Sequence, residues 1–236
     1  MRGLVRVGAA VPSLALGNVK ENMKRHLAMM REAKEKHVSI VTFPELSLTG
    51  YTCGDLFFQR RLLDDVTDAL LALKDEMPEG ILAVVGAPLE IEGALYNCAV
   101  VLHKGEIISA VPKTFLPNNG EFYEKRWFQS GDARRDASAA IPKLKTDVCR
   151  QAIFETEDGV RFGIELCEDL WAPLPPSTML SVEGAEIILN LSASNELLSK
   201  REYRQQLISQ QSARCQCGYV YVSAGMGESS SDLVFS

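Results

Sequence analysis

Glu45, Lys113 and Cys167 each stand directly after a short stretch rich in apolar, β-branched residues, with at most one proline between. Such stretches predict buried strands. Because the ends of strands in a sheet covered by helices can meet at one rim, we expect the three side chains to lie in one pocket. The three residues therefore form the first candidate for a reactive site.

A thiol, a carboxylate and an ammonium group together form a coherent set for nucleophilic attack on a carbonyl. Cys167 would attack the carbon, and Glu45 would take the thiol proton. Lys113 would stabilise the oxyanion and lower the thiol pKa from its usual value of about 8.5. This chemistry predicts cleavage of an amide or a related acyl compound.

Each of these residues also has an ordinary structural interpretation. Glu45 could be a loop carboxylate or a helix cap, and Lys113 an exposed charge at the end of a hairpin. Cys167 could be a small buried side chain, as most free cysteines are. The repetition of one pattern at three strand ends favours the reactive set.

Other familiar signatures are missing from the sequence. It has neither a phosphate-binding Gly-x-x-x-x-Gly-Lys-Ser/Thr loop nor a Gly-x-Ser-x-Gly motif. The histidines His26, His37 and His103 are expected on the surface rather than in catalysis. Cys215 and Cys217 have the wrong spacing for a zinc site and no histidine nearby, so no metal is expected.

The pattern of the chain predicts alternating strands and helices with two inserted hairpins. This arrangement is typical of a mixed sheet covered by helices. We expect one domain over residues 1–236. The longest expected loop covers 120–140. Strands are expected at 4–11, 38–43, 81–86, 95–102, 106–111, 150–155, 160–166, 186–190, 219–222 and 233–236, and helices at 19–37, 58–73, 179–183 and 200–214.

Composition excludes several classes of function. The 236 residues are 46% hydrophobic and 24% charged, with a formal net charge of −6. The acidic balance argues against nucleic-acid or anionic membrane binding, and no apolar run is long enough to cross a bilayer. Without a secretion signal, the six cysteines are expected to be reduced thiols in the cytoplasm.

Three segments resemble motifs of the nitrilase (carbon–nitrogen hydrolase) superfamily: FPELSLTGY at 43–51, KTFLPNNGEF at 113–122 and GIELCEDLW at 163–171. The resemblance implies an α-β-β-α sandwich of mixed sheets flanked by helices. It also implies a catalytic triad of Glu45, Lys113 and Cys167. Glu121 falls where the superfamily has a second glutamate that positions the lysine.

Within the superfamily, CEDLW at 167–171, NLSAS at 190–194 and the segment 225–235 resemble the glutaminase domain of the glutamine-dependent NAD synthetases. The resemblance places Ser194 and Lys200 at the α-amino and α-carboxylate groups of glutamine. The family usually has arginine at position 200, and lysine lacks its bidentate fork. Asn119 replaces a substrate-binding tyrosine, while Tyr51 and the Glu168 backbone would also line the pocket.

This resemblance further implies that the domain supplies ammonia to a C-terminal synthetase domain, which amidates deamido-NAD. That domain and the last strands of the amidase fold are expected to be absent from the chain. ATP, magnesium and deamido-NAD would belong to the absent domain, leaving no cofactor here. L-glutamine would be the substrate, and the protein would form homo-oligomers.

Two other functions stay open from the sequence. One is a stand-alone nitrilase-type amidase or carbamoylase acting on another small amide. The other is a non-catalytic assembly module, because amidases of this superfamily dimerise and assemble further.

Overall fold

Two β-sheets form the centre of the protein in the computed structural model, which describes residues 4–133, 138–225 and 227–235. The larger sheet has the strand order β1-β2-β3-β4-β5-β7-β6, and the smaller has the order β11-β10-β9-β8. The strands are β1 (Val7–Ala9), β2 (Ile40–Thr42), β3 (Leu82–Ile91), β4 (Ala94–His103), β5 (Glu106–Pro112), β6 (Ser138–Ile141), β7 (Thr146–Cys149), β8 (Ile153–Glu155), β9 (Arg161–Leu166), β10 (Ile187–Ser192) and β11 (Gly218–Ser223).

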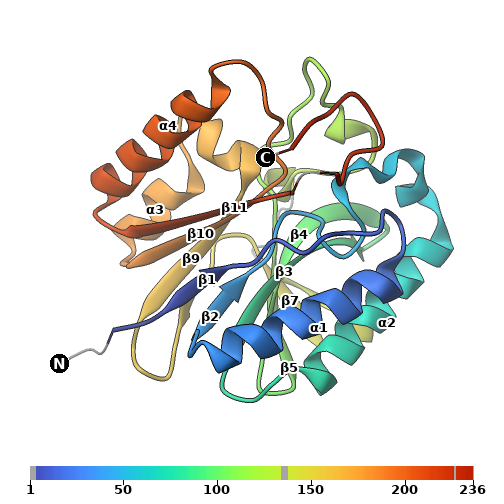
Figure 1. Ribbon diagram of the computed structural model, residues 1–236, viewed down its shortest axis with the longest axis horizontal. Helices are drawn as coiled ribbons and strands as arrows, with labels where there is room; N and C mark the ends of the chain where they lie inside the picture. Colours follow the sequence, from blue (N-terminus) through green and yellow to red (C-terminus); the bar gives the residue numbers. More distant parts are fainter. Residues whose placement is uncertain (1–3, 134–137, 226, 236) are drawn as a thin grey trace.

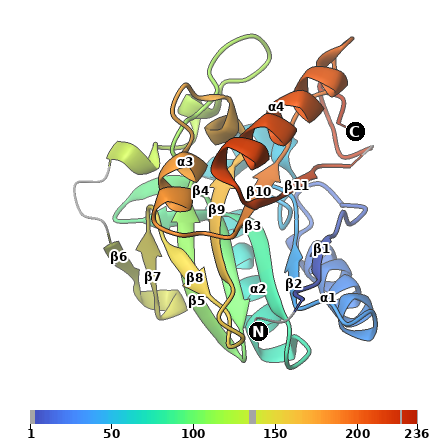
Figure 2. The ribbon, with the colours of Figure 1, turned by 90° about the vertical axis from the view of Figure 1, so that its left-hand side faces the viewer.

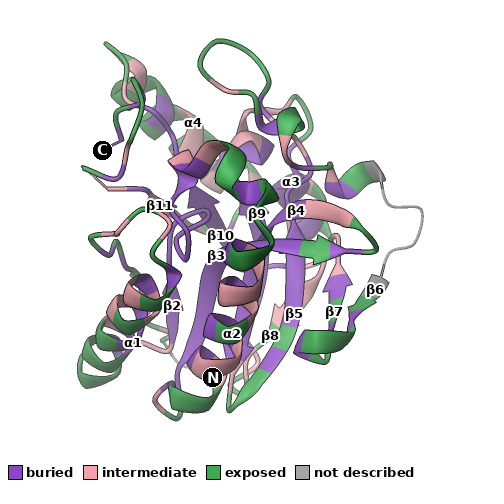
Figure 3. Ribbon diagram, turned by 90° about the vertical axis from the view of Figure 1, so that its right-hand side faces the viewer, coloured by how far each residue is buried: buried purple, intermediate pink, exposed green. Residues whose placement is uncertain are grey.

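The two sheets pack against each other through apolar side chains. Residues of β2 to β5 on the larger sheet meet residues of β9 and β10 on the smaller one in a single buried cluster that includes Val84, Val101, Ile164 and Leu189. Figure 3 shows this region as buried strand, with the exposed residues mainly on the helices and loops around it. Face-to-face packing of this kind holds the strand ends of both sheets close together.

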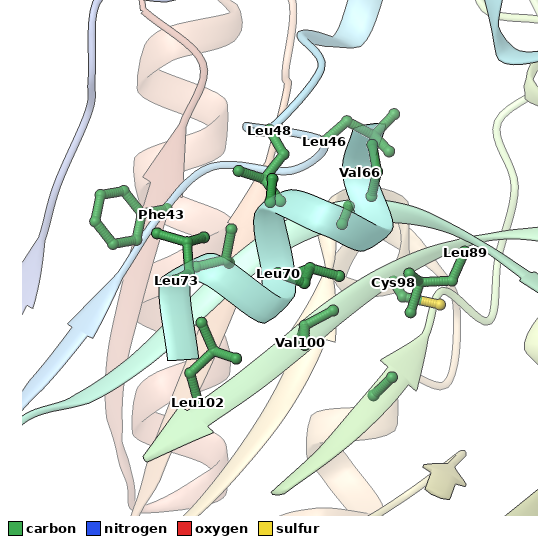
Figure 4. Packing of buried hydrophobic residues seen from close by; sticks show 14 of the residues in the cluster. Phe43, Leu46, Leu48, Val66, Leu70, Leu73, Leu89, Cys98, Val100 and Leu102 are labelled. Atoms are coloured by element: carbon green, nitrogen blue, oxygen red, sulfur yellow. The ribbon is translucent and has the colours of Figure 1, made fainter. Parts of the chain in front are cut away.

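Helices cover the two outer faces of this pair of sheets (Figure 1). α1 (Val19–Glu35) and α2 (Arg60–Glu76) lie on the larger sheet, and α3 (Pro176–Val182) and α4 (Lys200–Cys215) lie on the smaller one. Figure 4 shows Leu70 and Leu73 of α2 packed toward Val100 and Leu102 of β4. The order of layers is therefore α-β-β-α.

Local sequence explains where several elements begin and turn. The side chain of Asn18 accepts a hydrogen bond from the Glu21 amide and so caps α1. Lys104 and Gly105, both at positive φ, form the tight turn between β4 and β5. Glu92 and its glycine neighbour turn β3 back onto β4 in the same way.

The predicted α-β-β-α sandwich is confirmed, and the alternation of elements agrees with the prediction. Residue patterns alone indicated one mixed sheet, whereas the structure has two. β6 and β7, which lie beyond β5 at one margin (Figure 2), were not predicted. The expected loop 120–140 contains two short 3₁₀ turns and the start of β6, and its residues 134–137 lie outside the described part.

The strand expected at 233–236 is not a strand over its described residues. Phe235 forms only an isolated antiparallel bridge with Asn195, and Ser236 is not among the described residues. A single bridge leaves this segment without the ladder of hydrogen bonds that defines a strand. His26, expected on the surface, is fully buried on the inner side of α1.

Candidate active site

Glu45 lies in the turn that follows β2 and is completely buried. Its Oε1 accepts hydrogen bonds from Lys113 Nζ at 2.6 Å and from Asn97 Nδ2 at 2.7 Å. Its backbone N–H donates to the carbonyl of Ser192, on the smaller sheet, at 3.3 Å. The turn of Glu45 is therefore attached to both sheets.

The Glu45 turn reaches this position because β3 carries a glycine opposite it. A Cβ added at Gly86 would lie 2.3 Å from the Pro44 carbonyl oxygen and 2.4 Å from the Leu46 nitrogen. These distances are far below van der Waals contact, so any other residue would push the turn away. Gly86 thus determines how deeply Glu45 enters the site.

Lys113 follows β5 and is also completely buried. Its Nζ lies 2.6 Å from Glu45 Oε1 and 2.7 Å from Glu124 Oε1. Burial lowers the pKa of Lys113, but the charges of Glu124 and Glu45 outweigh burial and raise it well above its ordinary value. Lys113 is therefore a charged ammonium group held between two carboxylates.

The second glutamate at the lysine is Glu124, and the prediction of Glu121 was wrong. Glu124 is buried in a 3₁₀ turn, where its Oε1 also accepts a hydrogen bond from the Tyr51 hydroxyl at 2.6 Å. Glu121 is exposed on the preceding turn and accepts a hydrogen bond from Asn195 instead. Gly120, at positive φ, lies in a turn that is closed by a hydrogen bond from the Phe122 N–H to the Asn119 carbonyl at 2.9 Å.

Cys167 follows β9 and has a φ of 42°. A positive φ is strained for a residue with a side chain, and such strain is common where a nucleophile must be held at a sharp turn. The Cys167 N–H donates to Asn190 Oδ1 at 3.3 Å. The backbone of the nucleophile is thereby tied to β10.

Asp169 connects the Cys167 turn with the Lys113 segment. Its carboxylate accepts hydrogen bonds from the backbone N–H groups of Leu166 at 2.9 Å, Thr114 at 3.1 Å and Phe115 at 2.7 Å. The first N–H precedes the cysteine, and the other two follow the lysine. One buried carboxyl group therefore fixes the nucleophile and the ammonium group relative to each other.

The thiol of Cys167 is neutral at rest. Burial raises its pKa to about 12, the charge of Glu45 adds to this effect, and Lys113 opposes it. The prediction that lysine lowers the thiol pKa is right in direction, but burial and Glu45 outweigh that contribution. Cys167 must therefore lose its proton during the attack, which requires a base.

Glu45, Lys113 and Cys167 therefore share one centre, as the sequence predicts. Both charged groups act electrostatically on the thiol, and they contact each other directly. The two oxygens of Glu45 differ: Oε1 has two donors, whereas Oε2 is buried without a hydrogen-bond partner in the described structure. An unpartnered carboxylate oxygen is well suited to receive a proton.

Lys200, at the start of α4, lies beside two aromatic rings. Its Nζ is 5.3 Å from the ring centroid of Trp171 and 5.9 Å from that of Phe122. It also donates a hydrogen bond to Asn195 Oδ1, and Asn195 donates in turn to Glu121. These residues bring a cation and a carboxylate together at the edge of the site.

The other predicted substrate contacts have different surroundings. Ser194 is buried, and its Oγ accepts a hydrogen bond from Arg204 at 3.3 Å. Glu168 is half-buried, and burial raises its pKa against the opposing charges of Lys113 and Lys200. Asn119 is exposed in a turn, and Tyr51 lines a cavity of about 50 Å³ that includes Glu121.

Sequence reasoning missed Asn97, Gly86, Asp169 and Asn190. Asn97 had a visible signal, because it is the one strongly polar side chain within the apolar stretch 95–102. Gly86 had none, since its importance depends on a close approach between segments 40 residues apart in sequence. Asp169 and Asn190 stand in the quoted motifs, but only the fold shows which backbone groups they bind.

No group of three or more His, Cys, Asp or Glu residues in 4–133, 138–225 and 227–235 is arranged to hold a metal ion. Among the same residues, no helix is long and apolar enough to span a membrane.

Comparisons with known proteins identify the family of the chain. The model of the family described as Carbon-nitrogen hydrolase matches residues 6–235. A glutamine-dependent NAD(+) synthetase of Mycobacterium tuberculosis is 38% identical over 99% of this chain and 35% of its own length. One from Rattus norvegicus is 31% identical over 86% of this chain and 29% of its own length.

Solved structures give the same result. The glutamine-dependent NAD+ synthetase from Acinetobacter baumannii matches with a TM-score of 0.84 and 29% identity, covering 97% of this chain and 39% of that one. An amidase from Nesterenkonia, at 16% identity and a TM-score of 0.78 over 100% of this chain and 81% of its own, shares the fold. This chain spans about a third of the length of the curated relatives it matches.

Proposed function

The chain belongs to the carbon–nitrogen hydrolase family, and we propose that it is the glutaminase part of a glutamine-dependent NAD synthetase. In this proposal it hydrolyses the side-chain amide of L-glutamine and releases ammonia. A synthetase domain outside this chain would use the ammonia, and ATP, magnesium and deamido-NAD would bind there. The observation that carries the proposal is the buried contact between Glu45 and Lys113 beside the neutral thiol of Cys167.

The first half of the reaction forms a thioester. Glu45 Oε2 takes the thiol proton as Cys167 Sγ attacks the amide carbon, and the carbonyl π electrons move onto oxygen. The Lys113 ammonium stabilises this oxyanion. When the oxyanion collapses, the C–N bond breaks, and the proton on Glu45 passes to the nitrogen, which leaves as ammonia.

The second half reverses these roles with water. Glu45 takes a proton from a water molecule, whose oxygen attacks the thioester carbon. The C–S bond then breaks, the proton passes from Glu45 to the Cys167 sulfur, and glutamate leaves. The neutral resting thiol is thereby restored, and the balance is glutamine plus water giving glutamate plus ammonia.

Recognition of glutamine rests on the edge of the site. Lys200, held by Asn195 against Trp171, offers a cation for the α-carboxylate of the substrate. Ser194 is proposed at the α-amino group, with Tyr51 and the Glu168 backbone beside the substrate. The contact predicted for the exposed Asn119 stays a prediction.

Four other expectations also stay predictions. They are the cytoplasmic location, the formation of homo-oligomers, the absence of nucleic-acid and membrane partners, and the single domain over residues 1–236.

An electrophilic glutamine analogue tests this function directly. It is expected to label Cys167 stoichiometrically and to leave the other five cysteines largely unmodified. Peptide mass spectrometry locates the label. Labelling of Cys53, Cys98 or Cys215 with Cys167 untouched would overturn the assignment.

A panel of amides with ammonia detection then tests the substrate. Glutamine is expected to release ammonia faster than asparagine, simple aliphatic amides and carbamoyl compounds. Preference for one of the other compounds would favour a stand-alone amidase or carbamoylase. Cys167→Ala serves as the control that reports ammonia released without the nucleophile.

A further inference from the structure

Asn97 lies in the middle of β4 and is completely buried. Its side chain donates to Glu45 Oε1 at 2.7 Å, and its backbone carbonyl accepts from the Lys113 N–H at 2.8 Å. One strand residue thus contacts the proposed base through its side chain and the proposed oxyanion-stabilising residue through its backbone.

The chemistry of the contact determines which end of the Asn97 amide faces Glu45. An amide oxygen in this position would lie 2.7 Å from a carboxylate oxygen with no proton between them. The Nδ2 group supplies that proton, so Asn97 is the donor. Asn97 Oδ1 has no hydrogen-bond partner in the described structure, so the donation to Glu45 is the main polar contact of this side chain.

Lys113 alone does not fix the orientation of the Glu45 carboxylate strongly. Its ammonium group is shared with Glu124, and an ammonium on a flexible stem follows a rotating carboxylate. Asn97 adds a second donor from a rigid strand to the same oxygen that Lys113 contacts. With both donors at one oxygen, tilting the carboxylate out of this orientation would stretch two hydrogen bonds, so one oxygen stays unpartnered and faces a fixed direction.

We propose that Asn97 is a positioning residue that locks the Glu45 carboxylate with Oε2 toward the proton it must accept from Cys167. The inference rests on the proposed amidase function, because it concerns the base of that reaction. It accounts for a buried amide in an apolar strand, and no substrate contact is required of Asn97.

The test measures the covalent labelling of Cys167 by the electrophilic glutamine analogue, which requires the base but not complete turnover. Asn97→Leu keeps the approximate volume and removes the donor. It is expected to lower the maximal labelling rate about 10-fold to 100-fold, which is less than the roughly 100-fold to 10,000-fold that a positioned base contributes in full, because Glu45 itself stays in place. The half-saturating concentration of the analogue should change less than about threefold, because binding is not affected.

Two further variants separate positioning from packing. Asn97→Ser removes more volume but keeps an O–H donor that reaches Oε1 directly or through one water, so it should label faster than Asn97→Leu. A packing role predicts the reverse order, because serine leaves the larger cavity. Gln211→Met removes another buried amide, on α4 and outside the site, and should label at the wild-type rate.

The outcomes distinguish this inference from the proposed function. If wild-type Cys167 is not labelled, the proposed function fails. If wild type is labelled and Asn97→Leu is labelled at the same maximal rate, Asn97 does not position the base. A lower rate in Asn97→Leu accompanied by an equal rise in the half-saturating concentration also overturns the inference.

Discussion

The two sheets contribute to the site in different ways. The larger sheet supplies Glu45 and Lys113, whose side chains form a buried salt bridge between two strand ends. The smaller sheet supplies a neutral thiol, whose backbone is held at positive φ by polar neighbours such as Asn190. One side of the site therefore depends on charge balance, and the other depends on backbone geometry.

This difference predicts how substitutions in the two parts of the site should affect activity and stability. Two buried carboxylates share one lysine, so removing that cation leaves uncompensated charge in the core. Among the described residues, Cys167 itself forms no such charge pair. The two sides are linked by the backbone hydrogen bonds to Asp169 and by the Glu45 N–H, which donates to the Ser192 carbonyl. Changes in charge should damage the larger sheet's side most severely.

The largest effect is expected for Lys113→Met. Loss of one oxyanion donor typically costs about 3–4 kcal/mol of barrier, so the rate of ammonia release should fall about 100-fold to 1,000-fold. Removing one partner of a buried ion pair should also lower the free energy of unfolding by about 3–5 kcal/mol. Ammonia release and urea unfolding measure the two effects.

Lys143→Met is the matched control for this change, because Lys143 is exposed and forms a surface ion pair with Asp64. It should change both quantities little, since surface pairs contribute about 0–1 kcal/mol. A Lys113→Met protein that releases ammonia within about threefold of the wild-type rate would show that activity does not depend on the Lys113 charge.

Gly86→Ala is expected to damage the same side through geometry. The new Cβ would overlap the Glu45 turn at 2.3 Å, so the turn must move and the base must withdraw from the thiol. We expect at least about a tenfold loss of kcat and a destabilisation of about 1–3 kcal/mol, typical of overpacking. Steady-state ammonia release and thermal unfolding report these changes.

Gly218→Ala in β11 provides the comparison for Gly86→Ala. Its φ is not positive, and the added Cβ meets nothing closer than 3.8 Å. This variant should retain wild-type kcat. Equal behaviour of the two alanine variants would mean that the depth of the Glu45 turn is unimportant.

Substitutions of Glu121 and Glu124 should have smaller effects on the kinetics, and these effects should differ between the two residues. Burial raises the pKa of Glu124 to about 7, although the charge of Lys113 opposes this shift. Glu124→Gln removes a titratable acceptor at Lys113 and should lower kcat, whereas Glu121→Gln changes only the edge of the site and should act mainly on KM. Full kinetic curves for both variants test the assignment. A kcat loss confined to Glu121→Gln would restore the role that the sequence motif suggested.

Sequence could predict the reactive centre because each of its groups follows a strand. Glu45, Lys113 and Cys167 are placed by strand ends, and the apolar stretches that form the strands are visible without a structure. The choice between Glu121 and Glu124 was not visible, because both stand in one loop and the direction of each depends on the turn at Gly120. Loops carry less periodic information than strands.

Burial was the second quantity that the sequence did not supply. The expected fall in the Cys167 pKa considered the lysine charge and omitted the cost of burying a thiolate, which is the larger effect. His26 was placed on the surface for the same reason, since a helix pattern does not show that a polar side chain has a buried partner. Tertiary contacts decide both cases.

His26 supports the base side of the site and gives the last prediction. Its ring contacts Phe43 at 4.3 Å between centroids, its Nε2 lies 2.9 Å from Ser47 Oγ, and its Nδ1 lies 2.7 Å from the Asn22 carbonyl oxygen. Phe43 and Ser47 flank the Glu45 turn. Burial lowers the pKa of His26 from 6.5 to about 4, although the hydrogen bond to Asn22 partly opposes it.

Because folding keeps His26 neutral, the unfolded chain binds more protons than the folded protein between pH 6.5 and about pH 4. The stability that the neutral ring contributes is therefore present above pH 6.5 and is lost as the pH falls toward 4, by about 3 kcal/mol. His26→Gln should not show this loss. The difference in the free energy of unfolding between wild type and variant should therefore become smaller, by about 3 kcal/mol, between neutral pH and pH 4. Urea unfolding at several pH values measures this difference, with the exposed His37→Gln as the control. A difference in the free energy of unfolding between wild type and His26→Gln that stays constant with pH would contradict this prediction. It would mean that protonation of His26 does not destabilise the packing around the Glu45 turn, and that any loss of stability in acid comes from the carboxyl groups instead.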